Sequence, residues 1–482
     1  MAEIDPSLPI PLFYQLKTSI LEEIVAGKYG SAGRLPTEHE ICQRYGISRT
    51  PTHRALSELA DEGVIIRTRR KGTFVNPHWA PRRAAKSELR ISVTQAPLAE
   101  AIGKAPHGAL PVNVALMDYA EQRHTLLGAI AEGRAPDLAL IDETLIADFA
   151  DAGFLLPLDE LDPDWVSGEY DRDFVEPFIA GRRYEGRVYA VPEEINVAGL
   201  WCSRETLEAA GCDVPSTWVE LEATALEVQE LLPPGGRAFA MPGGHVAGET
   251  TSYCFLAVLA SNGVEFLDDS VRLGSPRAIE ALLMLRRLVA RGCMSADVVT
   301  YDWLRCPELL GSGRAAMTLG GSYEADVIAT AAGLEVAAIH DHFAFVPFPA
   351  GPDGSPATVA GGMVYVIFRQ TKHPKEALEM LERIVATDRL IERSTGRPTI
   401  PSRRSAIEVI AAESSFVAQA VELLSTAVNR PIIPDYHMIS TQLQNMLEAV
   451  LTGRYGPAAA AERTADVISA ITGLPVHRET RR

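Results

Sequence analysis

The sequence predicts a multidomain protein in which a small N-terminal winged helix-turn-helix unit of the α+β class precedes a large α/β body. Helical periodicity gives way to a short β-rich hairpin between residues 35 and 75, and strands and helices then alternate from residue 89 onward. The chain of 482 residues is also longer than a domain with a single hydrophobic core usually is. The predicted domains are residues 1–76, a linker over residues 77–88 that contains prolines and cations, and a body over residues 89–482.

The first predicted helix spans residues 11–26, where apolar side chains recur at helical intervals. A second helix is expected to begin at Thr37, because Thr37 and Glu40 have the spacing of a capping box. It should end near Gly46, since glycine adopts the left-handed conformation that a sharp turn requires. Ser48 is expected to cap the third helix, with Pro51 in its first turn.

The third helix has two faces of different chemistry. Thr52, Ala55, Leu56 and Leu59 recur at helical spacing and are expected to point inward. The opposite face carries side chains that can donate to phosphates and to base edges in a major groove; they are Arg49, Thr50, His53, Arg54 and Ser57. This pattern favours DNA binding, with Arg49 as the strongest candidate. A protein-interaction module remains the alternative, because a charged helix face is often simply solvated.

A hairpin with a basic tip follows the third helix. Residues 64–68 and 73–75 form β-rich runs, and Arg69, Arg70, Lys71 and Gly72 form the turn between them. Residues 1–90 contain 14 lysines and arginines against 10 acidic residues, a charge of +4. Since the whole chain carries −18, the remaining residues carry −22. This polarity predicts contact with DNA through the N-terminal end only, because the acidic body repels phosphates.

Composition excludes several other classes of protein. No apolar run reaches the length of about 20 residues that spans a bilayer, so no membrane partner is expected. The first residues lack the basic and apolar regions of a signal peptide, which predicts a cytoplasmic protein. The six cysteines form no C-x-x-C pair, and the histidines show no metal-ligand spacing. We therefore expect no metal and no cofactor.

Polar groups follow strand ends at several places in the body. The run Ala190–Val191–Pro192 is followed by Glu194 and Asn196, on a loop of the kind where open α/β sheets bind ligands. The glycines of residues 320–321 and 361–362 let a ligand approach the backbone, and the ring of Tyr323 could stack on a sugar. Asp142 ends a strand and is equally well explained as a helix cap. Trp201 and Trp218 are expected to pack in the core.

Residues 11–75, from PLFYQLK through LPTEHEICQRYGISRTPTHRALSELADEGVI to KGTFV, resemble the winged-helix domain of the GntR family of bacterial transcription regulators. His53 stands where that family usually carries arginine in its recognition helix. The resemblance implies an operator DNA partner. Together with the residue pattern, it predicts DNA contacts from Arg34, Glu38, Ser48, Arg49, Thr50, Thr52, His53, Arg54, Arg69, Arg70, Lys71 and Gly72.

The body, through segments such as APDLALIDETLIADFADAGFLLPLDEL, YEGRVYAVPEEINVAGLW, GSGRAAMTLGGSY and TGRPTIPSR, resembles the family 1 extracellular solute-binding proteins, the sugar-type receptors of ABC importers. This implies a two-lobed α/β fold of the periplasmic-binding-protein type (type II). Lobe 1 is predicted over about 89–193 and 320–360 and lobe 2 over about 197–318 and 364–475, with crossovers near Pro192, Gly320 and Gly361. His245 and Trp303 are further possibilities for the cleft. The predicted ligand-binding residues are Asp142, Glu143, Glu194, Asn196, Tyr253, Gly321, Ser322, Tyr323, Gly362, Met363 and Arg397.

The function expected from both parts is a ligand-responsive transcription regulator, a repressor acting as a homodimer, whose effector is a carbohydrate. A peptide, a polyamine or an acidic metabolite is the alternative effector. A GntR-type domain fused to an aminotransferase-like enzyme is disfavoured, because Lys104, Lys372 and Lys375 are the only lysines past the linker and none has suitable surroundings. A transport-binding protein is disfavoured by the same lack of a signal peptide.

Overall fold

The computed structural model describes residues 4–6, 10–25, 27–29, 33–68, 71–77, 88–104, 110–175 and 183–477. The chain divides into two compact units. Unit 1 comprises Met1–Ile141, Phe149–Pro157 and Val366–Glu382. Unit 2 comprises Asp142–Asp148, Leu158–Tyr365 and Arg383–Arg482.

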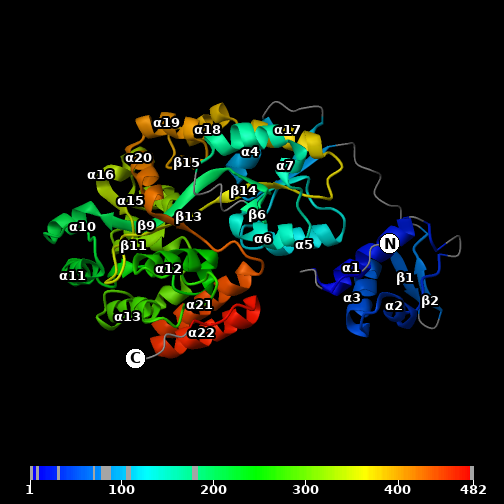
Figure 1. The fold of residues 1–482 in the computed structure, drawn as a ribbon, viewed down its shortest axis with the longest axis horizontal. Coiled ribbons are helices and arrows are strands. Elements are labelled where there is room, and N and C mark those ends of the chain that lie inside the picture. The colour runs from blue at the N-terminus through cyan, green and yellow to red at the C-terminus, as the bar shows by residue number, and fades with distance from the viewer. Residues whose placement is uncertain are drawn as a thin grey trace. The chain divides into compact units, whose positions relative to one another are not determined.

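The N-terminal part of unit 1 is a winged helix. Its helices are α1 (Leu12–Val25), α2 (Glu38–Tyr45) and α3 (Arg49–Asp61), drawn in blue in Figure 1. Strands β1 (Ile65–Thr68) and β2 (Gly72–Val75) pair antiparallel, with Ile65 opposite Val75 and Thr68 opposite Gly72. The core contains Leu16, Ile20, Ile41, Ala55, Leu56 and Leu59. The predicted helices and hairpin are confirmed.

The ends of α2 follow the local sequence. The Thr37 hydroxyl accepts the Glu40 N–H at 3.3 Å, and the Glu40 carboxylate accepts the Thr37 N–H at 2.7 Å, so the predicted capping box forms. Gly46 ends the helix in the left-handed region with φ 66°. Ser48 is the N-cap residue of α3, as predicted, although its hydroxyl makes no capping hydrogen bond.

The first sheet of the body has five strands in the order β4-β3-β5-β14-β8. Strand β3 pairs parallel with β4 on one side and with β5 on the other. The predicted alternation of strands and helices from residue 89 onward is confirmed. The strands of this sheet are β3 (Leu89–Val93), β4 (Val112–Leu116), β5 (Leu138–Asp142), β8 (Ala190–Pro192) and β14 (Met363–Ile367). The helices that follow these strands in the sequence include α4 (Ala96–Lys104), α5 (Gln122–Ala131), α6 (Ile146–Asp151) and α17 (Pro374–Ile384).

The second sheet has seven strands around the long central strand β9. Side chains of β9 alternate between two cores, with Leu200 and Cys202 in one and Val197 and Trp201 in the other. A strand that is apolar on both faces must be covered on both sides. The strands are β9 (Glu194–Ser203), β10 (Arg237–Ala240), β11 (Ala315–Gly321), β12 (Phe343–Val346), β13 (Thr358–Gly361), β15 (Ile400–Pro401) and β16 (Ala427–Asn429).

Helices of unit 2 supply the apolar surface that covers this sheet. Figure 1 shows α21 and α22, near the C-terminus, lying side by side. The helices of unit 2 with six or more residues are α10 (Arg204–Ala209), α11 (Trp218–Gln229), α12 (Glu249–Ser261), α13 (Pro276–Ala290), α14 (Arg305–Gly311), α15 (Ala325–Ala332), α18 (Thr387–Ser394), α19 (Arg404–Glu413), α20 (Ser415–Glu422), α21 (Tyr436–Leu451) and α22 (Pro457–Thr472).

The predicted division into lobes is wrong in its second half. Residues 320–360 were expected to join residues 89–193, but β12 and β13 both pair with β9 in the seven-stranded sheet. Gly320 lies inside β11, which continues to Gly321, so no crossover occurs there. Strand β14, expected in lobe 2, belongs to the five-stranded sheet. The chain changes sheets between β8 and β9, between β13 and β14, and again between β14 and β15.

Among the described residues, none of the helices combines the length and the apolar character needed to cross a membrane. Most of the predicted linker, residues 78–87, lies outside the described part of the chain. So do Arg69 and Arg70 of the predicted basic tip.

Candidate functional site

The exposed face of α3 carries four of the residues predicted to bind DNA. Ser48, Arg49, Thr50 and His53 are all exposed there. The carboxylate of Glu38, at the start of α2, lies 3.0 Å from the Nδ1 of His53 and 3.6 Å from the Nε of Arg49. Glu38 therefore gathers cationic side chains at the junction of α2 and α3.

Arg67 joins the same group from strand β1. Its guanidinium forms an ion pair with Glu38 and donates a hydrogen bond to the Ser57 hydroxyl at 3.1 Å. Burial alone would raise the pKa of Glu38, but the hydrogen bond from His53 and the charge of Arg67 outweigh it and lower that pKa. Sequence reasoning missed Arg67, because its strand was treated only as a scaffold for the basic tip.

Other predicted DNA contacts lie elsewhere. Thr52 is fully buried and its hydroxyl donates to the Ser48 carbonyl at 3.0 Å, so its side chain belongs to the core beneath the exposed face. Arg54 lies over the Phe13 ring of α1, 3.7 Å from its centroid, and pairs with Glu58. On the hairpin Lys71 is exposed. Gly72 has φ +117°, and a Cβ there would lie 3.5 Å from the Nε of Arg34.

The second candidate site lies in unit 2, where the chain leaves one sheet for the other. Gly361 ends β13, and a Cβ added to it would lie 2.9 Å from the Nη2 of Arg430 and 3.2 Å from the Tyr253 ring. A Cβ on Gly362 would lie 2.4 Å from the carbonyl oxygen of Glu194. Both glycines are required by this close approach. The carbonyl of Gly362 also accepts the Glu143 N–H at 3.3 Å.

Arg430 is the centre of this site, and it is only 6% exposed. Its guanidinium lies 3.2 Å from Asp142, 3.1 Å from Glu143 and 3.0 Å from Glu249. Its carbon centre lies 5.4 Å from the centroid of the Tyr253 ring. The site thus combines three carboxylates with one buried cation.

Glu249 begins α12 and accepts hydrogen bonds from Tyr436 and Ser440 of α21 as well as from Arg430. Burial raises the pKa of Glu249; Arg430 opposes this effect and the charge of Asp142 reinforces it. Asp142 also caps the turn that follows β5, accepting the Thr144 N–H at 2.9 Å. The capping interpretation of Asp142 is therefore correct, and Asp142 also forms an ion pair with Arg430.

Glu194 begins β9, where the chain passes from one sheet to the other, and its carboxyl group has a raised pKa. Burial raises its pKa to about 7, reinforced by the charge of Glu193 and opposed by Asn196, Arg393 and Arg397. The amide of Asn196 donates weakly to Glu194 at 3.5 Å. Glu193 is held by two hydrogen bonds from Arg393, at 2.8 and 2.9 Å. A carboxyl group with this pKa can accept or donate a proton near neutral pH.

The segment Gly321–Tyr323, which was predicted to bind ligand, is hydrogen-bonded to β9. The carbonyl of Gly321 accepts the Trp201 indole N–H at 3.1 Å, and the Ser322 hydroxyl accepts the Val197 N–H at 3.2 Å. Ser322 is 1% exposed, so it orders the loop and does not present its hydroxyl. Tyr323 forms an edge-to-face pair with Trp303, with centroids 6.3 Å apart.

The remaining predicted residues divide between surface and core. Arg397 is exposed, and its charge acts on Glu194. The hydroxyl of Tyr253 donates to the Val359 carbonyl at 3.0 Å, which leaves its ring as the group facing Arg430. His245 pairs with Glu448 at 3.0 Å. Met363 is buried, as are Trp201 and Trp218, which confirms the core assignment of both tryptophans.

Sequence reasoning missed Arg430, Glu249, Tyr436 and Ser440. Arg430 follows the short strand β16, and the other three lie on helices distant in sequence from the glycine motifs. A buried arginine requires carboxylate partners, but the sequence does not indicate which of its 63 acidic residues they are.

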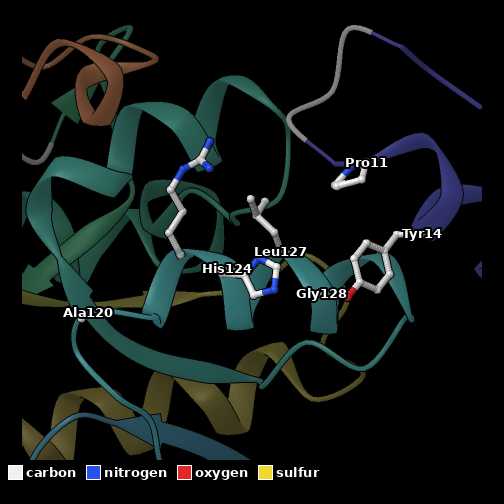
Figure 2. Close-up of a pocket in the computed structure, with 7 residues that line it drawn as sticks. Pro11, Tyr14, Ala120, His124, Leu127 and Gly128 are labelled. Carbon is white, nitrogen blue, oxygen red and sulfur yellow. The ribbon is translucent and has the colours of Figure 1, made fainter. Parts of the chain in front are cut away.

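Two other groups of residues could be read as binding sites. A pocket in unit 1 is lined by Pro11, Tyr14, Ala120, Arg123, His124, Leu127 and Gly128 (Figure 2), none of which was predicted to bind DNA or ligand. One ligating atom each from Asp148, Asp435 and His437 lies within 4.8 Å of the others. The N–H of Asp435, at the start of α21, donates to Asp148. This interaction is explained by the helix start, and we assign no metal there.

Comparison with known proteins defines the class of the chain. Residues 94–383 match the family model for bacterial extracellular solute-binding proteins, and residues 14–75 match that for bacterial regulatory proteins of the gntR family. The chain therefore belongs to the bacterial extracellular solute-binding protein family and carries a gntR-type winged helix at its N-terminal end. Both resemblances expected from the sequence are confirmed.

Individual relatives cover one part or the other. A binding protein of Brucella abortus (strain 2308) is 24% identical over 348 residues, which are 71% of this chain and 81% of that protein. The probable fructoselysine utilization operon transcriptional repressor of Escherichia coli (strain K12) is 39% identical over 64 residues, 13% of this chain and 26% of the repressor. The GacH receptor of Streptomyces glaucescens, solved unliganded and with acarbose, superposes with a TM-score of 0.71 at 22% identity, over 81% of this chain and all of the receptor. This last likeness supports the fold alone.

Proposed function

We propose that the chain is a ligand-responsive transcription regulator, whose winged helix binds operator DNA and whose solute-binding body senses a small molecule. The observation that carries this proposal is the presence of both domains in one chain. A solute-binding domain joined to a DNA-binding domain can change DNA binding when it binds its solute. The proposal includes repression, a cytoplasmic location and a homodimer. A dimer is expected because one winged helix contacts too few base pairs for a specific operator.

The effector is proposed to be a carbohydrate. The fold is that of the acarbose receptor GacH, and the edge-to-face pair Trp303 and Tyr323 offers aromatic surface of the kind that stacks on sugar rings. Binding would alter operator affinity if open and closed states of the body differ in their affinity for DNA, and a coupling of about 1–3 kcal/mol is typical.

The first experiment identifies an operator by selecting duplexes from a random library with the full chain, and then screens mono- and oligosaccharides by thermal shift. A sugar that raises the melting temperature should change operator affinity about 5- to 150-fold. The variant Arg49→Ala should lose operator binding and keep the thermal shift, whereas the exposed control Arg454→Ala should keep both. An effector that binds without changing operator affinity in wild type would contradict the proposed coupling.

A further inference from the structure

The two ring nitrogens of His53, on the exposed face of α3, have different surroundings. The Nδ1 lies 3.0 Å from an oxygen of the Glu38 carboxylate. The Nε2 has no hydrogen-bond partner among the residues that the structure describes, and the side chain keeps 61% of its accessible surface. One nitrogen is therefore held by the protein, and the other is available to a molecule that contacts this face.

The charge of Glu38 decides which nitrogen of His53 carries the hydrogen. Burial raises the pKa of Glu38, but the hydrogen bond from His53 and the charge of Arg67 outweigh burial, and the pKa is lowered. The carboxylate is therefore ionised at neutral pH and can only accept hydrogen bonds. Since the Nδ1 of His53 must then donate, the neutral ring has its hydrogen on Nδ1 and a lone pair on Nε2.

Two arginines hold the Glu38 carboxylate in place. Arg67 forms an ion pair with the same carboxylate oxygen as His53 and donates to the Ser57 hydroxyl at 3.1 Å. The Nε of Arg49 lies 3.6 Å from the other oxygen. One carboxylate thus has two permanently charged neighbours, and its charge is balanced without a second hydrogen on the His53 ring. Glu38 and Arg67 orient this ring.

A lone pair at position 53 has a different complement in DNA from the arginine fork. In the major groove, adenine and cytosine present amino groups that donate, whereas guanine and thymine present oxygens that accept. Arginine pairs with the acceptors of guanine. A lone pair cannot bond a phosphate oxygen, because both groups are acceptors. His53 lies about one turn after the start of α3, and the first residues of a recognition helix are those that contact base edges.

We propose that the Nε2 of His53 accepts a hydrogen bond from an adenine or cytosine of the operator, with Glu38 and Arg67 as the positioning residues that fix its tautomer. This inference rests on the proposed function, because it requires operator DNA. It specifies one base of the operator as adenine or cytosine on the strand that His53 contacts, and it excludes guanine and thymine there.

The test compares the duplexes that full-length wild type and His53→Ala select from a random library at about pH 8, where histidine is ordinarily neutral. One position should be adenine or cytosine with wild type and unspecified with His53→Ala. Guanine or thymine at that position should weaken wild-type binding about fivefold or more, the usual cost of a mismatched base pair. The exposed control His342→Ala in unit 2 should select the wild-type sequence.

Two further variants test the chemistry of this contact. His53→Arg replaces the acceptor with donors and should select guanine at the same position. Glu38→Gln has an amide that both donates and accepts, so it no longer fixes the hydrogen on Nδ1. The preference for adenine or cytosine should then weaken at the position that depends on His53. An unchanged preference in Glu38→Gln would contradict the positioning role of Glu38.

Identical base preferences of wild type and His53→Ala at every position would overturn the proposal, as would guanine or thymine at the position whose preference His53→Ala loses. If His53→Ala selects no sequence, wild type is compared with His53→Arg, and the same base selected by both would overturn it equally. A wild-type chain that enriches no sequence would contradict the proposed regulator as well. The assay contains no effector, so a missing ligand response would leave its result unchanged.

Discussion

At the scale of single residues, Glu38 and His53 distinguish the proposed DNA-binding face of α3 from a uniformly basic one. Glu38 holds Arg49, His53 and Arg67, which come from α3 and β1, around one carboxylate. A histidine is a weaker and conditional cation at neutral pH compared with an arginine. The exposed face of α3 should therefore bind the DNA backbone less strongly than it would with arginine at position 53.

The substitution His53→Arg should strengthen binding to a random-sequence duplex at neutral pH, because it adds a permanent charge with phosphate-binding geometry. The dependence of log affinity on log salt should steepen by about 1, the value for one added phosphate contact. Fluorescence anisotropy between about 50 and 200 mM salt measures this slope. The exposed His342→Arg in unit 2 is the matched control; an equal change in both variants would show that total charge, and not position 53, sets the affinity.

Glu194 gives a pH dependence whose sign follows from its raised pKa. The pKa is about 7 in the folded chain against an ordinary value of 4.5, so the folded state holds the proton more tightly than the unfolded state. Its contribution to stability is fully present below pH 4.5 and is lost as the pH rises through about 7. The loss at pH 8 is about 3 kcal/mol for a shift of this size.

The variant Glu194→Gln should therefore be more stable than wild type at pH 8 and should differ little from it near pH 4.5. Denaturant unfolding of unit 2, followed by tryptophan fluorescence across this range, measures the difference. The exposed Glu227→Gln on α11 is the control and should leave the pH dependence unchanged. A wild-type pH dependence that persists in Glu194→Gln would assign the effect to another carboxyl group.

At the scale of elements, helix α2 depends on its capping box more than on its length. It has eight residues, too few for a stable helix in isolation, and the single fully buried side chain on it is Ile41. The hydrogen bonds between Thr37 and Glu40 satisfy backbone groups that would otherwise be unpaired at its first turn.

The substitution Thr37→Ala should cost about 1 kcal/mol in the local stability of α2. Hydrogen exchange of the amides in Glu38–Tyr45 should accelerate about fivefold, as opening of the helix becomes easier by that amount. Thr50→Ala, an exposed threonine in the first turn of α3, is the matched control. Unchanged exchange in Thr37→Ala would show that packing against α3, and not the cap, limits the opening of α2.

At the scale of the whole molecule, charge is distributed very unevenly. The first 90 residues carry +4 and the remainder −22. DNA attracts the first part and repels the second, with a range set by the Debye length of about 10 Å at 0.1 M salt. The acidic body should therefore weaken nonspecific DNA binding by the intact chain.

A fragment of residues 1–88 should bind a random-sequence duplex more tightly than the full chain at about 50 mM salt, and the difference should shrink above about 0.2 M, where screening shortens the repulsion. Filter binding over a salt series measures the affinities of the fragment and of the full chain. Residues 89–482 alone serve as the control and should not bind. Equal affinities of fragment and full chain at low salt would show that the charge of the body does not act on DNA.

The sequence by itself determined the features that depend on neighbouring residues. The capping box at Thr37, the glycine turn at Gly46, the wing and the strand at residues 89–93 all follow from local spacing. The sequence also placed Asp142, Glu143, Glu194 and Tyr253 among the ligand candidates, and the structure locates all four around the crossovers between its sheets.

Only the tertiary structure decided which segments share a sheet and which charges meet. Strands β12 and β13 pair with β9, and no local pattern encodes a pairing between residues that are 140 or more positions apart. Arg430 reaches Asp142 and Glu143 from nearly 290 residues away. Local rules act through backbone geometry over a few residues, whereas a buried ion cluster depends on the whole fold bringing distant segments together, and so only the structure reveals it.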